Sequence, residues 1–186
     1  NQAVNLATNT TGTLGVANGG TGLTSGTTDQ FLKFTGSTTL ASAADNAGKI
    51  LQIKNATSTS TTSTSSSSYT HFSSIDLSIT PTSSSSKIIV HFTSNFDNEA
   101  DNNRQGYVSC WREIDSANNI VLSDPMAQPA YSPDRRVSGT VSWTFIDTPS
   151  STGSVRYRPV LKSQTGNQVN MGGFRNTLLL MEATIA

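Results

Sequence analysis

The chain has 186 residues, of which 34% are apolar and 13% charged, and its formal net charge is zero. This length allows one domain with an appendage, and the zero net charge gives no electrostatic reason to expect nucleic acid or an anionic membrane as a partner. The single cysteine, Cys110, excludes an intrachain disulfide, and no apolar run is long enough for membrane insertion. Stability must therefore come from packing and from association between copies.

Residues 1–48 contain no hydrophobic core of their own. Apolar residues occur singly among Thr, Asn and Gly, and only Phe31–Phe34 predicts a short strand, followed by a turn at 35–37. Such a segment cannot offset its ordering entropy alone. We expect it to be extended and to order by winding against identical copies.

A glycine-rich motif gives the strongest indication of function. The run GVANGGTG at 15–22 resembles the VANGGTG repeat of bacteriophage tail-fibre and other virion-fibre proteins, and DQFLKFTG at 29–36 resembles the segment that often follows it. Glycine allows a positive φ and close backbone approach, which three chains around one axis would require. A plain Gly/Thr linker is the alternative. The resemblance implies a trimeric fibre stalk over 1–48.

The remainder, 49–186, predicts β-strands and shows no helical periodicity. The unbroken Ser/Thr run at 57–68 predicts an exposed loop, and the polar turn 81–86 predicts a hairpin between its two flanking strands. We predict an all-β fold, an antiparallel, jelly-roll-like β-sandwich head. The expected strands are 49–56, 69–80, 87–96, 105–114, 120–123, 137–146, 154–163 and 176–185.

A second, less distinctive resemblance lies around that turn. The segment 78–90, SITPTSSSSKIIV, is similar to a β-rich domain at the C-terminal end of marine phage structural proteins. It implies the same β-rich head as the strand pattern does.

The last predicted strand, 176–185, is apolar on both faces. Leu178 and Leu180 point one way, whereas Met181 and Ile185 point the other. A doubly apolar strand needs cover on both sides. It is either the central strand of an ordinary sandwich or a strand whose second face joins an oligomer, and under the second interpretation these four residues form a homotrimer interface.

No catalytic motif or cofactor site is evident. His71 and His91 lack the partner spacing of a metal site, and no serine lies in a GxSxG motif. We therefore expect no catalytic residues, no cofactor and no enzyme activity.

One acidic segment partly resembles a calcium loop. Asp97, Glu99 and Asp101 place oxygen ligands at every second position, but the turn glycine is not sixth and Val108 stands where a closing Glu belongs. A solvated loop is the first interpretation, with a weak calcium site as the alternative.

A group of aromatic and polar residues could recognise sugars. Aromatic rings cover the apolar faces of sugars while polar groups bond their hydroxyls. The alternative is that these aromatic side chains fill the core or a subunit seam. The candidate ligand-binding residues are Tyr107 and Trp111 on one strand and Tyr131, Asp134, Arg135 and Arg136 in the proline-containing loop 124–136.

The fibre resemblance implies a virion protein. Its stalk would join other virion proteins, and its head would attach to a glycan or protein on the host surface. The main alternative is a capsid head-fibre or decoration protein with a purely structural role. A third alternative, a fibre-borne polysaccharide depolymerase, predicts paired carboxylates in a groove.

Overall fold

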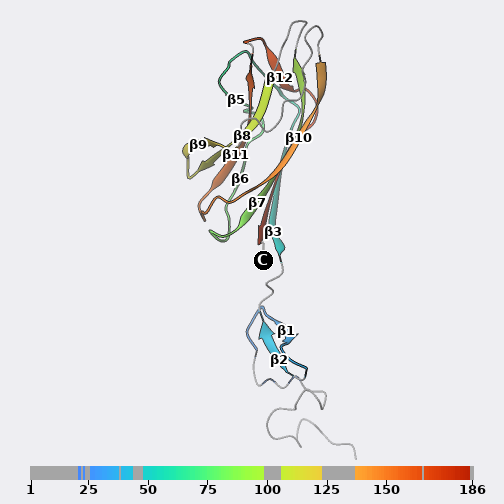
Figure 1. Ribbon diagram of the computed structural model, residues 1–186, viewed down its shortest axis with the longest axis vertical. Helices are drawn as coiled ribbons and strands as arrows, with labels where there is room; N and C mark the ends of the chain where they lie inside the picture. The colour runs from blue at the N-terminus through green and yellow to red at the C-terminus, as the bar shows by residue number, and fades with distance from the viewer. Residues whose placement is uncertain are drawn as a thin grey trace, which may run out of the picture. The chain divides into compact units, whose positions relative to one another are not determined.

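A computed structural model describes residues 21, 23, 26–37, 39–43, 48–98, 106–122, 137–164 and 166–184 (Figure 1). The chain divides into two compact units, Asn1–Ala47 and Gly48–Ala186, with a boundary next to the predicted one. Over the described ranges, no helix is long and apolar enough to cross a membrane.

The described part of the first unit is a small antiparallel hairpin. Strand β1 (Phe31–Phe34) pairs with β2 (Leu40–Ala43), and Thr35 N donates to Thr39 O at 2.9 Å. The predicted strand and the turn that follows it are both present. The GVANGGTG motif lies outside the described residues, except for Thr21.

The second unit consists of two antiparallel sheets. The larger sheet contains six strands and the smaller sheet five. The strands of the larger sheet are β3 (Lys49–Ser58), β4 (Thr61–Thr64), β7 (Lys87–Asn98), β10 (Val137–Asp147), β12 (Val169–Gly172) and β13 (Asn176–Thr184). Those of the smaller sheet are β5 (Thr70–His71), β6 (Leu77–Ile79), β8 (Gly106–Ile114), β9 (Ala117–Val121) and β11 (Val155–Ser163).

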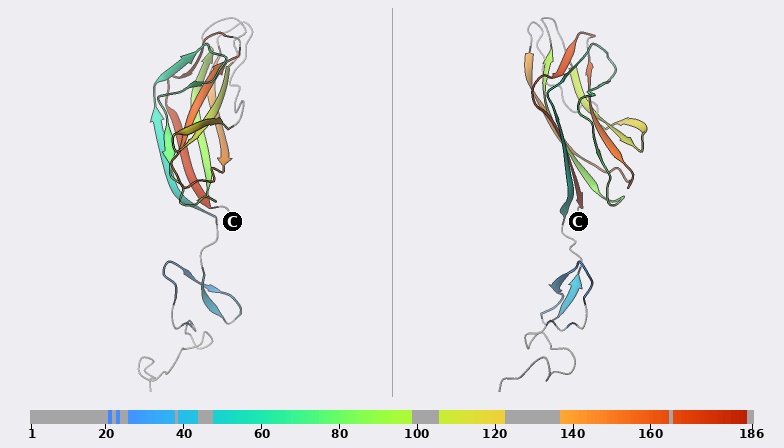
Figure 2. Two further views of the ribbon diagram at one scale, coloured as in Figure 1. Left: turned by 90° about the vertical axis from the view of Figure 1, so that its left-hand side faces the viewer. Right: turned by 180° about the vertical axis from the view of Figure 1, so that it is seen from behind.

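Several strands occupy one position of a sheet in two pieces. β3 and β4 pair with β13 and β12 respectively, and β5 and β6 both pair with β11. Counted by position, the larger sheet reads β3/β4, β13/β12, β7, β10, and the smaller reads β5/β6, β11, β8, β9. The chain passes between the two layers in the order of a jelly roll (Figure 2). This order confirms an all-β antiparallel sandwich.

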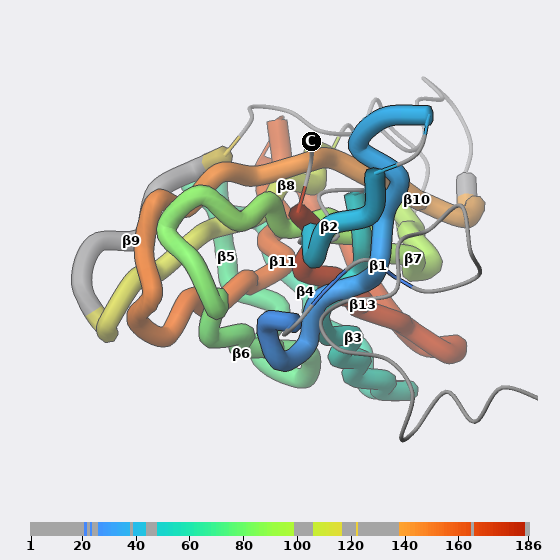
Figure 3. Tube along the Cα trace, turned by 90° about the horizontal axis from the view of Figure 1, so that it is seen from below, coloured from blue at the N-terminus to red at the C-terminus, as the bar shows by residue number. Residues whose placement is uncertain are grey.

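The core lies between the two sheets. Alternate side chains of β7, β8, β11 and β13 point inward, as the sequence patterns predicted. Seen from below, β5, β6, β8, β9 and β11 lie on one side of the second unit, and β3, β7, β10 and β13 lie on the other (Figure 3). The largest fully buried apolar side chains are Phe72, Ile75, Ile79, Ile88, Phe92, Phe96, Leu161, Met171, Leu178 and Leu180.

Two predictions about the strands are wrong. The Ser/Thr run at 57–68 is not one exposed loop, because its first residues complete β3 and Thr61–Thr64 forms β4. Threonine suits a half-buried pleated surface, so a hydroxyl-rich run can form an edge strand. The predicted hairpin between 69–80 and 87–96 is also absent, because β5 and β6 pair with β11 while β7 pairs with β10, β12 and β13.

One buried carboxylate fastens the turn after β6 to the larger sheet. Glu182 is fully buried, and its Oε1 accepts hydrogen bonds from Thr82 N (2.7 Å), Thr82 Oγ1 (2.7 Å) and Ser86 Oγ (2.6 Å). Its Oε2 accepts one from Gln52 Nε2. Burial alone would raise the pKa of Glu182, but the bonds from Gln52, Ser86 and Thr82 outweigh it and lower the pKa from 4.5 to about 2.

Candidate functional site

Two neighbouring strand positions of the larger sheet are interrupted at the same place. Between β3 and β4 the break is Thr59–Ser60, and between β12 and β13 it is 173–175. The register aligns them, because Gly172 pairs with Thr61 and Asn176 with Ser58 on either side. The longer break forms a bulge, and bulges often re-aim side chains next to functional sites.

Asn176 holds this double break together from inside. Its Nδ2 donates to Ser58 O (3.0 Å) and Ser60 O (3.2 Å), and its Oδ1 accepts from Ser94 Oγ (2.6 Å). Asn176 is fully buried, so these bonds satisfy backbone carbonyls that the break removes from the ladder.

Glycine is required where the two breaks touch. Gly172 has φ +113°, and a Cβ at this position would lie 2.0 Å from Ser60 O. Gly173 follows with φ +83°. The pair turns the chain outward, so the next residue, Phe174, leaves the sheet with 70% of its surface exposed.

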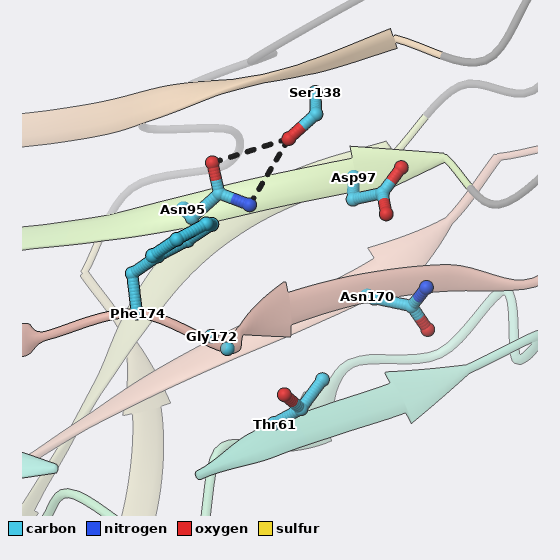
Figure 4. Close-up of a pocket in the computed structure, with 8 residues that line it drawn as sticks. Thr61, Asn95, Asp97, Ser138, Asn170, Gly172 and Phe174 are labelled. Carbon is cyan, nitrogen blue, oxygen red and sulfur yellow. Dashed lines mark hydrogen bonds between the residues drawn. The ribbon is translucent and has the colours of Figure 1, made fainter. Parts of the chain in front are cut away.

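The bulge forms one wall of a hollow of about 450 Å³ on the outer face of the larger sheet. Its other residues stand on four adjacent strand positions (Figure 4). The lining residues are Thr61, Asn95, Asp97, Ser138, Asn170, Gly172, Gly173 and Phe174. We call this hollow the Phe174 hollow.

Most polar groups of the Phe174 hollow come from amides and hydroxyls. Asn95 Nδ2 donates to Ser138 Oγ at 3.1 Å, and Ser138 Oγ lies 3.3 Å from Asn95 Oδ1 (Figure 4). Gln168 Nε2 donates to Asn170 Oδ1 at 3.3 Å. These bonds hold the amides in place, and each amide keeps donor or acceptor positions for a ligand.

A second, smaller hollow lies on the other side of the bulge. It measures about 290 Å³ and is lined by Thr57, Ser58, Thr59 and Arg175. The bulge therefore presents an aromatic ring to one hollow and a guanidinium group to the other.

This arrangement suits the binding of a polar ligand. An exposed ring beside fixed amides and hydroxyls can stack on the C–H face of a sugar and bond its hydroxyl groups. Among the described residues, no cluster of three His, Cys, Asp or Glu could hold a metal ion.

Comparison with known proteins gives only distant similarity. No family model and no curated protein matches the chain. A structure of infectious bursal disease virus Gx strain matches 83% of this chain and 36% of its own chain, with 9% identity and a TM-score of 0.42. The structure of the Gt strain is matched over 42% of its own chain, with 10% identity and a TM-score of 0.39. The VP2 subviral particle of the same virus is matched over 41% of its own chain, with 10% identity and a TM-score of 0.32. The chain spans about two fifths of the length of these chains, and the function proposed below rests on its own residues.

The two predicted sugar-binding residues that the structure describes, Tyr107 and Trp111, do not line the Phe174 hollow. Tyr107 and Trp111 point outward from β8 in the smaller sheet, where Trp111 stacks on His71 with ring centroids 6.5 Å apart. Tyr107 donates a hydrogen bond to Gln164 Oε1. Tyr131, Asp134, Arg135 and Arg136 lie outside the described residues.

The predicted interface residues separate into two groups. Leu178 and Leu180 are fully buried in the protomer's own core, so they cannot contact another subunit. Met181 lies on the outer face of the larger sheet, and Ile185 is outside the described residues. β13 is thus a central strand, paired on both sides. Of the calcium candidates, Asp97 lines the Phe174 hollow, while Glu99 and Asp101 are not described.

Sequence reasoning missed the bulge. The predicted strands leave 164–175 as a loop, whereas Val169–Gly172 forms β12. The available signal was the Gly172–Gly173 doublet directly before an aromatic residue, because glycine within a strand pattern marks a bulge or a close backbone approach.

Proposed function

We propose that the chain is a fibre protein of a phage virion and that its head attaches to a glycan on the host surface. The Phe174 hollow carries the attachment part of the proposal, because it combines a 70% exposed ring with fixed amides and hydroxyls. The GVANGGTG resemblance supports the virion location, and jelly rolls occur among capsid and lectin domains. In a homotrimeric fibre, three weak sites would act together through avidity.

An array of purified bacterial surface polysaccharides, probed with the full-length protein, tests this function. We expect the wild type to bind at least one polysaccharide and Phe174→Ala to weaken that binding at least tenfold, because the stacking ring is lost. Phe174 is exposed, so the melting temperature should stay unchanged and exclude misfolding as the cause.

The Trp111→Ala variant serves as the matched control. It removes an outward aromatic side chain from the smaller sheet, and we expect it to keep wild-type binding. Loss of binding in this variant alone would move the site to the face predicted from sequence. Absence of binding to every bacterial polysaccharide would reject glycan attachment.

A structural role is the second candidate, and the first unit favours it. All four residues of β1 are exposed, including Phe31, Leu32 and Phe34. Exposed apolar side chains in a short hairpin are typical of a surface that other subunits cover. A capsid head-fibre or decoration protein would use this hairpin for assembly and need no host ligand.

A further inference from the structure

The outer face of the larger sheet is uncharged over most of its length. Side chains of β7 that alternate with the buried Ile88, Val90 and Phe92 point to this face, and the register extends each of them into a row across the sheet. From the row of Ile89 to the row of Thr93, no position carries Asp, Glu, Lys or Arg, and Arg175 of the bulge lies beyond the last of these rows. We call these rows the uncharged face.

One end of the uncharged face is apolar from edge to edge. Ile53, Met181, Ile89 and Ile146 are direct register partners on β3, β13, β7 and β10. The two edge residues are the most exposed, Ile53 at 62% and Ile146 at 59%. Single exposed apolar residues are common, but a continuous row across four strands marks a contact surface.

The other rows can bond to an identical face. They consist of Thr, Ser and Asn, with Leu179 and His91. His91 bonds to Thr144 Oγ1 (2.7 Å) and Thr93 Oγ1 (3.1 Å), which orders the hydroxyls on this face. Hydroxyl and amide groups both donate and accept, so two copies of such a face meet without like-charge repulsion and with complementary hydrogen bonding.

The dimensions of the uncharged face suit the centre of such a contact. Four strand positions span about 14 Å and three rows span about 13 Å, which with side chains gives a patch of a few hundred Å². An interface between two copies would extend around this centre to about 800 Å² on each side. Lys87 lies beyond one end of the patch and Asp97 beyond the other. An uncharged centre with charges at its rim is the usual anatomy of a protein–protein interface.

We propose that copies of this chain pack against one another through the uncharged face, with the row of Ile53, Met181, Ile89 and Ile146 at the centre of the contact. Along β7, Ile89 lies about 20 Å from Asn95, the lining residue of the Phe174 hollow that is nearest to it on this strand, so a contact centred on the row of Ile89 leaves the hollow open. The proposal goes beyond glycan attachment and stands whether or not the hollow binds a sugar.

Cross-linking in the full-length chain tests the proposal. Ile53→Cys and Ile146→Cys are combined in one chain and treated with a bismaleimide shorter than their separation, which is about 14 Å across three strand spacings. Any cross-link must then join two chains. Cys110 is buried and does not compete. We expect covalent oligomers from this variant and none from Ser63→Cys, which lies at the other end of the same face.

Light scattering provides the second measurement. The wild-type mass should be a multiple of the chain mass of 19.6 kDa. The double variant Ile53→Lys/Ile146→Lys should self-associate at least tenfold more weakly. If the first unit alone holds the chains together, the mass will not change. In that case, Lys at these two positions should still abolish the cross-linking of an added Met181→Cys. A monomeric wild type, or equal cross-linking of Ser63→Cys and the double cysteine variant, would overturn the proposal.

Discussion

The two outer faces of the sandwich differ in how they treat charge. On the smaller sheet, Glu113 bonds to Arg158 at 3.1 Å and lies 3.7 Å from Arg156, while Asp76 pairs with His71 and with Arg158 at 3.5 Å. On the larger sheet, the uncharged face has hydroxyls, amides, apolar groups and the imidazole of His91. The ion pairs of Glu113 and Asp76 thus lie on the smaller sheet, whereas Lys87 and Asp97 lie beyond the ends of the uncharged face.

The two faces therefore differ in how they interact with solvent and with other molecules. The charges of the smaller sheet are neutralised within the protomer, so that face stays soluble and attracts little beyond its own partners. The larger sheet lacks such charges and is also the sheet with the double break and its hollow. The two surfaces proposed above to bind other molecules therefore both lie on the larger sheet.

The largest expected effect comes from a substitution at the double break of the larger sheet. Gly172→Ala should lower the free energy of unfolding by at least about 4 kcal/mol, because its Cβ would clash with Ser60 O at a positive φ. Urea denaturation measures the loss. Gly139→Ala in β10 is the control, since no heavy atom lies within 4 Å of its Cβ, and it should change stability by less than about 0.5 kcal/mol. Equal effects from both would refute the close-approach argument.

A smaller effect, dependent on pH, concerns the buried carboxylate of the larger sheet. The pKa of Glu182 is lowered from 4.5 to about 2 in the folded protein, so its ionised form stabilises the fold above pH 4.5. That contribution, about 3 kcal/mol, is lost as the pH falls from 4.5 to 2. Glu182→Gln should be less stable than wild type at pH 7 and about equal to it at pH 2, measured by denaturant unfolding. A constant difference across this range would contradict the assignment.

The smallest effect distinguishes the smaller sheet by its response to salt. Glu113→Gln removes the partner of Arg158 and should cost about 1 kcal/mol at low ionic strength. In 1 M salt the cost should decrease, because the pair reaches the surface, with 20% of the Arg158 side chain and 11% of the Glu113 side chain exposed. Thermal unfolding at both salt concentrations measures it. The cost of Glu182→Gln should hardly change with salt, since that carboxylate is fully buried.

Local patterns predicted most of the strands because alternation reports which side chains face the core. On β8, for example, Val108 and Cys110 point to the core, whereas Tyr107 and Trp111 point outward. Pairing could not be predicted in this way, since alternation does not choose a partner. Lys49 pairs with Thr184, and the apparent partner across the turn at 81–86 lies in the other sheet. β4 has no apolar residue, and β12 has only Val169 and Met171, so the alternation in these two short strands was not recognised.

Predicting the candidate site from the sequence would have required the strand pairing even more. The glycine doublet alone could predict a bulge, but the hollow also needs the Thr59–Ser60 break beside it. Asn176 joins the two breaks across a separation of 118 residues along the chain. Contacts over such a separation are decided by the register of the folded sheet.

The way the bulge is held has a consequence for evolution. Gly172 and Asn176 fix the sheet on its two sides, and residues 173–175 between them carry no strand pairing. Substitutions at 174 and 175, or insertions next to them, can therefore accumulate without shifting the register of β12 or β13, whereas the positive φ of Gly173 favours glycine at that position. Selection on what the head recognises can then act on this short segment, while selection on stability acts on the residues that flank it.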